Sequence, residues 1–169
     1  MNKNNIILDS NVFIDFFFGG KPTIFVLLPG KLFITKEVYN EIKDSHRYVD
    51  QIVSEGRIFV LKETSPQNAE FQEIKSWNSA LSDADITSLL ATRKMGCLLL
   101  SGDRIVRETA KEKHLPIRGT LWAIEELFHL GAFSFQEVKI FYQKCLESKR
   151  RLPREEIEKQ LKRFEKSER

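Results

Sequence analysis

The sequence predicts an α/β fold in which a small parallel sheet is covered by helices. Short apolar runs alternate with amphipathic segments along most of the 169 residues, which is the pattern of βαβ units. The first run, Ile6-Ile7-Leu8, lacks the polar alternation of a half-exposed strand, so it is predicted to be buried on both faces. A chain of this length buries enough surface for one domain with its own core.

The elements are predicted in an order that alternates strand and helix until the last quarter of the chain. We expect strands at 5–9, 32–34, 57–61, 97–100 and 116–118. We expect helices near 12–18, 22–28, 36–45, 47–55, 67–78, 83–95, 104–113 and 120–130, and a closing helical hairpin of 134–148 and 154–166. Residues 1–132 are predicted to form the main domain, and 133–169 a hairpin that packs on it or extends it.

Local signals support several of these bounds. Ser82 is a good N-cap for the helix 83–95, and Gly96 is a good stop after it. Pro153 suits the first turn of the last helix, where its missing N–H costs nothing. The run Phe16-Phe17-Phe18 lies at the end of a predicted helix, where consecutive residues are about 100° apart. At least one of these rings is therefore expected outside the core that buries the others.

Composition restricts the class of protein. The two cysteines, Cys97 and Cys145, have neither the number nor the spacing of a disulfide framework or a zinc site. We see no export signal and no apolar run of 18 residues, so we expect no membrane partner and a cytoplasmic location. The net charge is only +3, but region 143–169 holds ten Lys and Arg against six acidic residues. Its densest part, ESKRRLPR, either contacts phosphates or is a solvated helix face.

Two of the predicted strands end near an aspartate. Asp9 follows Ile6-Ile7-Leu8 directly, and Asp103 follows Leu98-Leu99-Leu100 after two small residues. If the two strands are neighbours, both carboxylates lie at the carboxyl edge of the sheet, where α/β proteins bind ligands. Each aspartate also precedes a helix, so helix capping is the alternative role.

Two further carboxylates flank the buried faces of helices. Asp85 lies in the first turn of the helix 83–95, where Ser82 and Asp85 also match a capping box. Glu41 lies beside an apolar position of the helix 36–45, with Glu37 and Asp44 as alternatives. Alone, Glu41 reads as a solvated side chain, so the interpretation rests on the set of four acids.

Several converging carboxylates predict a bound cation. Without one, mutual repulsion raises their pKa values. Ligands that are all oxygen select Mg²⁺ or Mn²⁺ over zinc. Such an ion activates water and stabilises charge on a phosphodiester, which is nuclease chemistry. A glycosidase needs only two carboxylates, and no aromatic platform for a sugar is evident nearby.

Four segments together resemble PIN-domain proteins of the type related to VapC toxins: IILDSNVFIDF, FITKEVYNEI, LSDADITSLLATRKMGCLLLSGDR and IRGTLWAIEELFHLGAFS. The terminal KRRLPREEIEKQLKRF resembles the extension of one PIN subgroup. The resemblance implies a three-layer α/β/α fold with five parallel strands in the order 3-2-1-4-5, plus the hairpin. It places the family's acidic residues on Asp9, Glu41, Asp85 and Asp103, with Asn11 and Ser101 in support. Asp83 occupies a place where the family commonly has other residues, so it ranks below Asp85 and is taken only as a supporting residue.

The function that the resemblance implies is that of a metal-dependent endoribonuclease. Asp9, Asp85 and Asp103 would hold Mg²⁺ or Mn²⁺, and Glu41 would orient the ion and water. RNA, a cognate antitoxin and a second copy of the chain are the implied partners. The basic residues expected to contact RNA are Arg104, Arg107, Lys149, Arg150 and Arg151. The alternatives are a non-catalytic PIN-like module that binds RNA or protein, and a haloacid-dehalogenase-like phosphatase. The phosphatase would need a second aspartate where this chain has Asn11.

Overall fold

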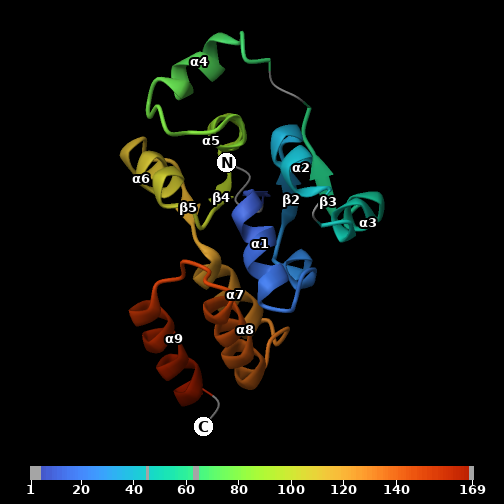
Figure 1. The fold of residues 1–169 in the computed structure, drawn as a ribbon, viewed down its shortest axis with the longest axis vertical. Helices are drawn as coiled ribbons and strands as arrows, with labels where there is room; N and C mark the ends of the chain where they lie inside the picture. Colours follow the sequence, from blue (N-terminus) through green and yellow to red (C-terminus); the bar gives the residue numbers. More distant parts are fainter. Residues whose placement is uncertain (1–4, 45, 63–64, 168–169) are drawn as a thin grey trace. The chain divides into compact units, whose positions relative to one another are not determined.

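A five-stranded parallel sheet organises the computed structural model, which describes residues 5–44, 46–62 and 65–167 (Figure 1). Its strands are β1 (Asn5–Leu8), β2 (Lys31–Ile34), β3 (Ile58–Val60), β4 (Leu98–Leu100) and β5 (Ile117–Arg118). Their order is β3-β2-β1-β4-β5, and each neighbouring pair is parallel. This order confirms the predicted topology, with β1 and β4 adjacent at the centre.

The register of the central strands fixes which residues leave the sheet together. Leu8, the last residue of β1, pairs with Leu100, the last residue of β4. The backbone N–H of Asp9 then donates to the carbonyl of Leu100 at 3.0 Å, which extends the pairing by one residue. Asp9 and Ser101, the residues that follow the two strands, therefore emerge side by side at the carboxyl edge.

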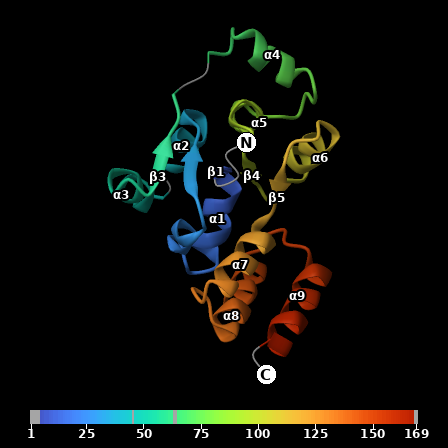
Figure 2. The same cartoon turned by 180° about the vertical axis from the view of Figure 1, so that it is seen from behind.

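The chain forms two compact units, and the first, Met1–Val12 with Pro29–Gly119, contains the whole sheet. α5 packs on β1 and β4, α3 on β3, and α6 on β5, while α2 and α4 pack on α5 (Figures 1 and 2). The helices are α2 (Lys36–Ile42), α3 (Tyr48–Ser54), α4 (Ala69–Lys75), α5 (Asp83–Met95) and α6 (Arg104–Glu112). They flank the sheet in the predicted α/β/α arrangement.

The bounds of α5 match the sequence signals. Ser82 caps it in a complete capping box, and Gly96 follows it with a left-handed φ of 57°. A side chain at Gly96 would strain this backbone, which explains why the helix stops at a glycine.

The second unit, Phe13–Leu28 with Thr120–Arg169, is helical. It contains the end of α1 (Ser10–Phe18), the short 3-10 helix η1 (Ile24–Leu27), α7 (Thr120–His129), α8 (Phe135–Glu147) and α9 (Arg154–Ser167). The α-helix predicted at 22–28 is a single 3-10 turn instead. Pro22 and Pro29 bracket this segment, and proline interrupts helical hydrogen bonding, so too few residues remain for an α-helix. The predicted division after residue 132 stays a prediction.

A buried ion pair and an aromatic cluster hold the second unit together. The Asp15 carboxylate accepts hydrogen bonds from Arg150 Nε at 2.7 Å and from Thr120 Oγ1 at 2.6 Å. The Phe16 ring lies 5.3 Å from the ring of Phe25 and 5.2 Å from that of Phe141. These contacts join α1 to η1, α7, α8 and the segment before α9.

Exposure separates the three consecutive phenylalanines, as the helical spacing predicts. Phe16 is fully buried, whereas Phe17 is 43% exposed and Phe18 is 41% exposed. Within the described ranges, no helix is long and apolar enough to cross a membrane.

The end of α1 is tightly packed at two glycines. Gly20 has a φ of 78° and ends the helix in a Schellman arrangement, in which Lys21 N donates to Phe16 O and Gly20 N to Phe17 O. Gly19 lies against the ring of Phe141, and a Cβ at this position would approach Phe141 Cε2 to 2.1 Å. The close approach of α1 to α8 thus depends on the absence of a side chain at Gly19.

We predict that Gly19→Ala lowers the free energy of unfolding by about 1–3 kcal/mol, because the added methyl group forces the Phe141 ring out of its place. Urea titration followed by circular dichroism measures the change. Adding Phe141→Leu to Gly19→Ala should cost less than the sum of the two single changes. Strict additivity would contradict the proposed clash.

Candidate active site

The carboxylate of Asp9 is the centre of a polar site where β1 ends and α1 begins. Asp9 is only 1% exposed. Its Oδ1 accepts a hydrogen bond from Ser10 N at 2.7 Å, and its Oδ2 accepts from Ser101 Oγ at 2.5 Å and more weakly from Asn11 Nδ2 at 3.5 Å. The structure therefore brings two of the three predicted supporting residues, Asn11 and Ser101, to Asp9.

Ser101 links Asp9 to Asp103. Besides donating to Asp9, the Ser101 hydroxyl accepts a hydrogen bond from Asp103 N at 3.1 Å. The Asp103 carboxylate in turn accepts from Val106 N at 3.0 Å and caps α6. The capping role considered for Asp103 is thus real, and it places the carboxylate beside the end of β4.

Asp85 also combines a capping role with a place in the acidic site. Its Oδ2 accepts from Ser82 N at 2.7 Å, and its own N–H donates to Ser82 Oγ at 3.2 Å. Asp83, in the same first turn of α5, is exposed. Of the two, Asp85 is the one whose charge acts on the pKa of Asp9.

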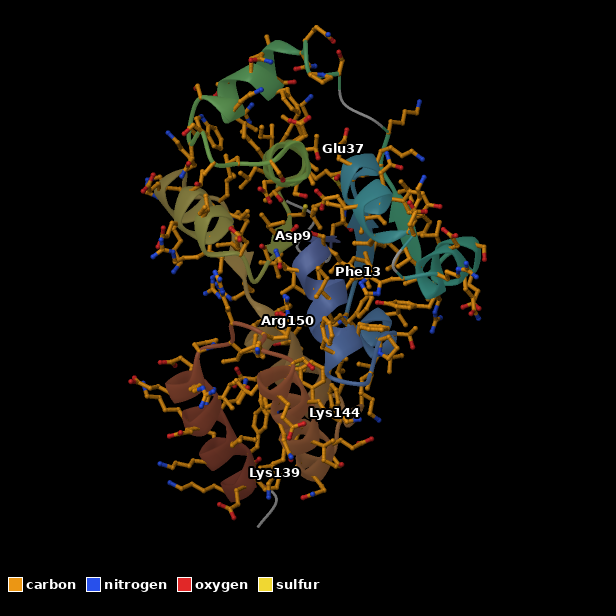
Figure 3. All side chains as sticks on the ribbon, in the orientation of Figure 1. Asp9, Phe13, Glu37, Lys139, Lys144 and Arg150 are labelled. Carbon is orange, nitrogen blue, oxygen red and sulfur yellow. The ribbon has the colours of Figure 1, made fainter. Side chains whose placement is uncertain are left out.

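Glu41 reaches the site from α2, which is fixed to α5 by a buried contact. The hydroxyls of Thr35, the N-cap of α2, and Thr87 of α5 are hydrogen-bonded at 3.0 Å. Glu41 itself is exposed, and its carboxylate is hydrogen-bonded by the Ser10 side chain. Ser10 thus connects Glu41 to Asp9, a role that the sequence interpretation missed. Its position directly after Asp9 indicates that Ser10 lies near the site, but no local pattern indicates its contact with Glu41. Figure 3 shows Asp9 at the start of α1 and Glu37 on α2.

Burial and mutual repulsion raise the pKa values of three of the four acids. Desolvation raises the pKa of Asp9 to about 6, and the charge of Asp85 adds to the effect. Partial desolvation of its carboxylate also raises the pKa of Glu41, although the residue as a whole is exposed, and Asp85 contributes further. The pKa of Asp85 is raised by burial and by the charge of Asp103. The rise was predicted, but its main cause is desolvation rather than repulsion between neighbours.

The basic residues predicted to contact RNA have different surroundings. Arg104 is highly exposed and lies 3.8 Å from Glu108, and Arg107 is partly buried on α6. Arg150 forms an ion pair with Asp15, whereas Lys149 and Arg151 are exposed in the second unit. Arg104 and Arg107 belong to the unit that carries the acids.

The chemistry of the donors fits a hard divalent cation. The four acids supply only oxygen, and a cation would relieve the repulsion that Asp85 exerts on Asp9 and Glu41. In the described part of the chain, no three acidic, His or Cys side chains are grouped tightly enough to hold an ion by themselves. Mg²⁺ commonly takes one or two carboxylates directly and completes its shell with water and substrate phosphate, so water molecules would connect the ion to the remaining acids.

Comparison with known proteins identifies a family and solved structures of similar fold. A family model, DUF3368, described as a PIN domain, matches residues 5–166. A PilT N-terminus domain protein from the hyperthermophilic archaeon Sulfolobus solfataricus has a similar structure, with a TM-score of 0.49 and 14% identity. The match covers 72% of this chain and 91% of that one. No curated protein matches the sequence.

We predict that Asp9→Asn stabilises the metal-free protein at pH 8, by up to about 3 kcal/mol, and has little effect at pH 4. Because the folded-state pKa of Asp9 is raised from 3.8 to about 6, the native state binds more protons in this window. Wild-type stability should therefore fall as the pH rises from 4 to 6, and the variant should lack this component.

Urea titrations at pH 4, 6 and 8 in EDTA test this expectation. Glu112→Gln, which removes an exposed charge from the last turn of α6, serves as the control. An Asp9→Asn protein that is less stable than wild type at pH 8 would contradict the prediction.

Proposed function

Because the chain belongs to the PIN-domain family and so has a nuclease-type fold, we propose that it is a metal-dependent endoribonuclease that hydrolyses RNA phosphodiesters. The observation that carries the proposal is the buried Asp9 carboxylate, held between β1 and β4 with its pKa raised to about 6. Desolvating a carboxylate costs stability, and such a cost is typical of functional sites.

The four acids have distinct parts in the proposed reaction. Asp9, Asp85 and Asp103 would hold Mg²⁺ or Mn²⁺, which when bound activates water and polarises the scissile phosphate. Ser101 and Ser10 N fix the Asp9 carboxylate through hydrogen bonds to its two oxygens. Glu41, exposed at the rim and with a raised pKa, would orient the attacking water and accept its proton.

The two alternative functions are distinguished by the fold and by assay. A haloacid-dehalogenase-like phosphatase does not fit the PIN family, and Asn11, where that enzyme needs an aspartate, donates a hydrogen bond to Asp9. A non-catalytic PIN-like module would bind RNA and leave it intact. All four acids are present and lie in the same unit, which favours cleavage over binding alone.

The proposal also includes a protein partner that binds the second unit. Phe17, Phe18 and Leu27 of the second unit are each more than 40% exposed, and exposed apolar side chains are typical of interaction surfaces. We propose that an antitoxin encoded beside this chain is the partner, with a second copy of the chain as the alternative.

We predict that the wild-type protein cleaves RNA in millimolar Mn²⁺ and that Asp9→Asn lowers the rate by about 100-fold or more, because a metal-holding carboxylate is lost. Gel analysis of end-labelled single-stranded and structured RNAs measures the rate, and Glu112→Gln should cleave like wild type. Equal cleavage by wild type and Asp9→Asn would refute the assignment. Binding without cleavage would identify the non-catalytic module.

We also predict that millimolar Mn²⁺ raises the melting temperature of the wild type more at pH 8 than at pH 5. Below its pKa of about 6, Asp9 is protonated in the folded state, so the ion must displace a proton. Differential scanning fluorimetry measures the shift. A shift that is equally large in Asp9→Asn would exclude this carboxylate as a ligand.

A further inference from the structure

The guanidinium of Arg107 fills the place of a missing side chain beside the acidic site. Gly119 follows β5 directly, and a Cβ built on it would lie 2.3 Å from Arg107 Nη1 and 3.3 Å from its Cζ. The same Cβ would lie 3.7 Å from the carbonyl oxygen of Ser101. Arg107 therefore extends from α6 across the carboxyl end of β5, next to the residue that holds Asp9.

The backbone keeps this position close to the acids. Ser101 N donates to the carbonyl of Arg118 at 3.0 Å, which places Ser101 alongside the end of β5. Arg107 N donates to the carbonyl of Asp103 at 3.1 Å, so Arg107 lies one helical turn after that acid. A ligand that reaches Asp9 and Asp103 would pass this edge.

Arg107 forms no ion pair with any residue in the described ranges of the chain. Other cations of the same unit do: Arg93 pairs with Glu73, and Arg104 lies 3.8 Å from Glu108. The guanidinium is partly buried and packed on backbone, and its N–H groups are not neutralised by a carboxylate. Such an arrangement suits an anion supplied from outside the protein.

We propose that Arg107 binds a backbone phosphate of the RNA next to the scissile phosphodiester. We also propose that the absence of a side chain at Gly119 leaves the room in which the Arg107 guanidinium is held for this contact. This inference rests on the proposed nuclease function. A guanidinium presents a planar set of donors that matches two phosphate oxygens, whereas a lysine supplies only a point charge. The acids would act on one phosphate while Arg107 fixes its neighbour.

Binding is measured apart from cleavage by placing every variant in the Asp9→Asn background. Fluorescence anisotropy with a labelled, mixed-sequence, single-stranded 12-nucleotide RNA gives the Kd over a salt series. Arg107→Gln should weaken binding about tenfold and lower the slope of log Kd against log salt by about 0.7, because one phosphate contact is lost. Arg107→Lys should retain most of the slope and regain only part of the affinity.

Two further variants distinguish a specific phosphate contact by Arg107 from a general effect of positive charge on RNA binding. Lys111→Gln removes an exposed cation from the same helix and should change Kd less than twofold. Gly119→Ala leaves the charge of Arg107 intact and displaces its flexible end, so it should weaken binding nearly as much as Arg107→Gln. In the double variant, Gly119→Ala should add nothing to Arg107→Gln.

The outcomes distinguish this inference from the function on which it rests. Suppose that the wild-type protein cleaves RNA but that, in the Asp9→Asn background, Arg107→Gln binds RNA no worse than Lys111→Gln. The proposed phosphate contact is then refuted, and the nuclease assignment stands. If Gly119→Ala weakens binding equally with and without Arg107, the seating role is wrong. A protein that neither binds nor cleaves RNA overturns both proposals.

Discussion

The rest of the site depends on one constraint, the burial of the Asp9 carboxylate at the end of the central strand. A carboxylate that is 1% exposed must satisfy its oxygens inside the protein, and it does so with Ser10 N, Ser101 Oγ and, weakly, Asn11. Those partners come from the starts of α1 and of the segment after β4, so the pairing of β1 with β4 and the hydrogen bonding of Asp9 require each other. The charge of Asp85 adds to the rise in the pKa of Asp9, and a bound cation would offset this repulsion.

Helix capping and the proposed site chemistry use the same side chains in this protein. Asp85 accepts a hydrogen bond from the N–H of Ser82, the N-cap of α5, and Asp103 accepts one from Val106 N in the first turn of α6. The positive end of each helix favours the negative charge of its aspartate. The acids can therefore be kept close together at a lower electrostatic cost than in an isolated cluster. The two interpretations of each aspartate are complementary descriptions of one arrangement.

The positions of the strands and of most helices were predictable from apolar runs and from residues at the ends of elements, and the strand order from the resemblance to PIN-domain proteins. That the four acids act together as one metal site stays a prediction. The 3-10 turn at η1 was missed because its apolar residues resemble a helix, and only the flanking prolines limit its length. The bridge from Ser10 to Glu41 and the seating of Arg107 on Gly119 were not predictable. Both depend on side chains from different elements meeting in space, which no local pattern encodes.

The buried pair of Asp15 and Arg150 also constrains how the chain folds. These residues are 135 positions apart, and the second unit draws one part from residues 13–28 and the other from 120–169. During synthesis, the apolar end of α1 leaves the ribosome long before α8 exists to cover Phe16. The nascent chain therefore carries an incomplete helical unit until α7, α8 and α9 have emerged, and the apolar side chains at the end of α1 stay uncovered during that interval.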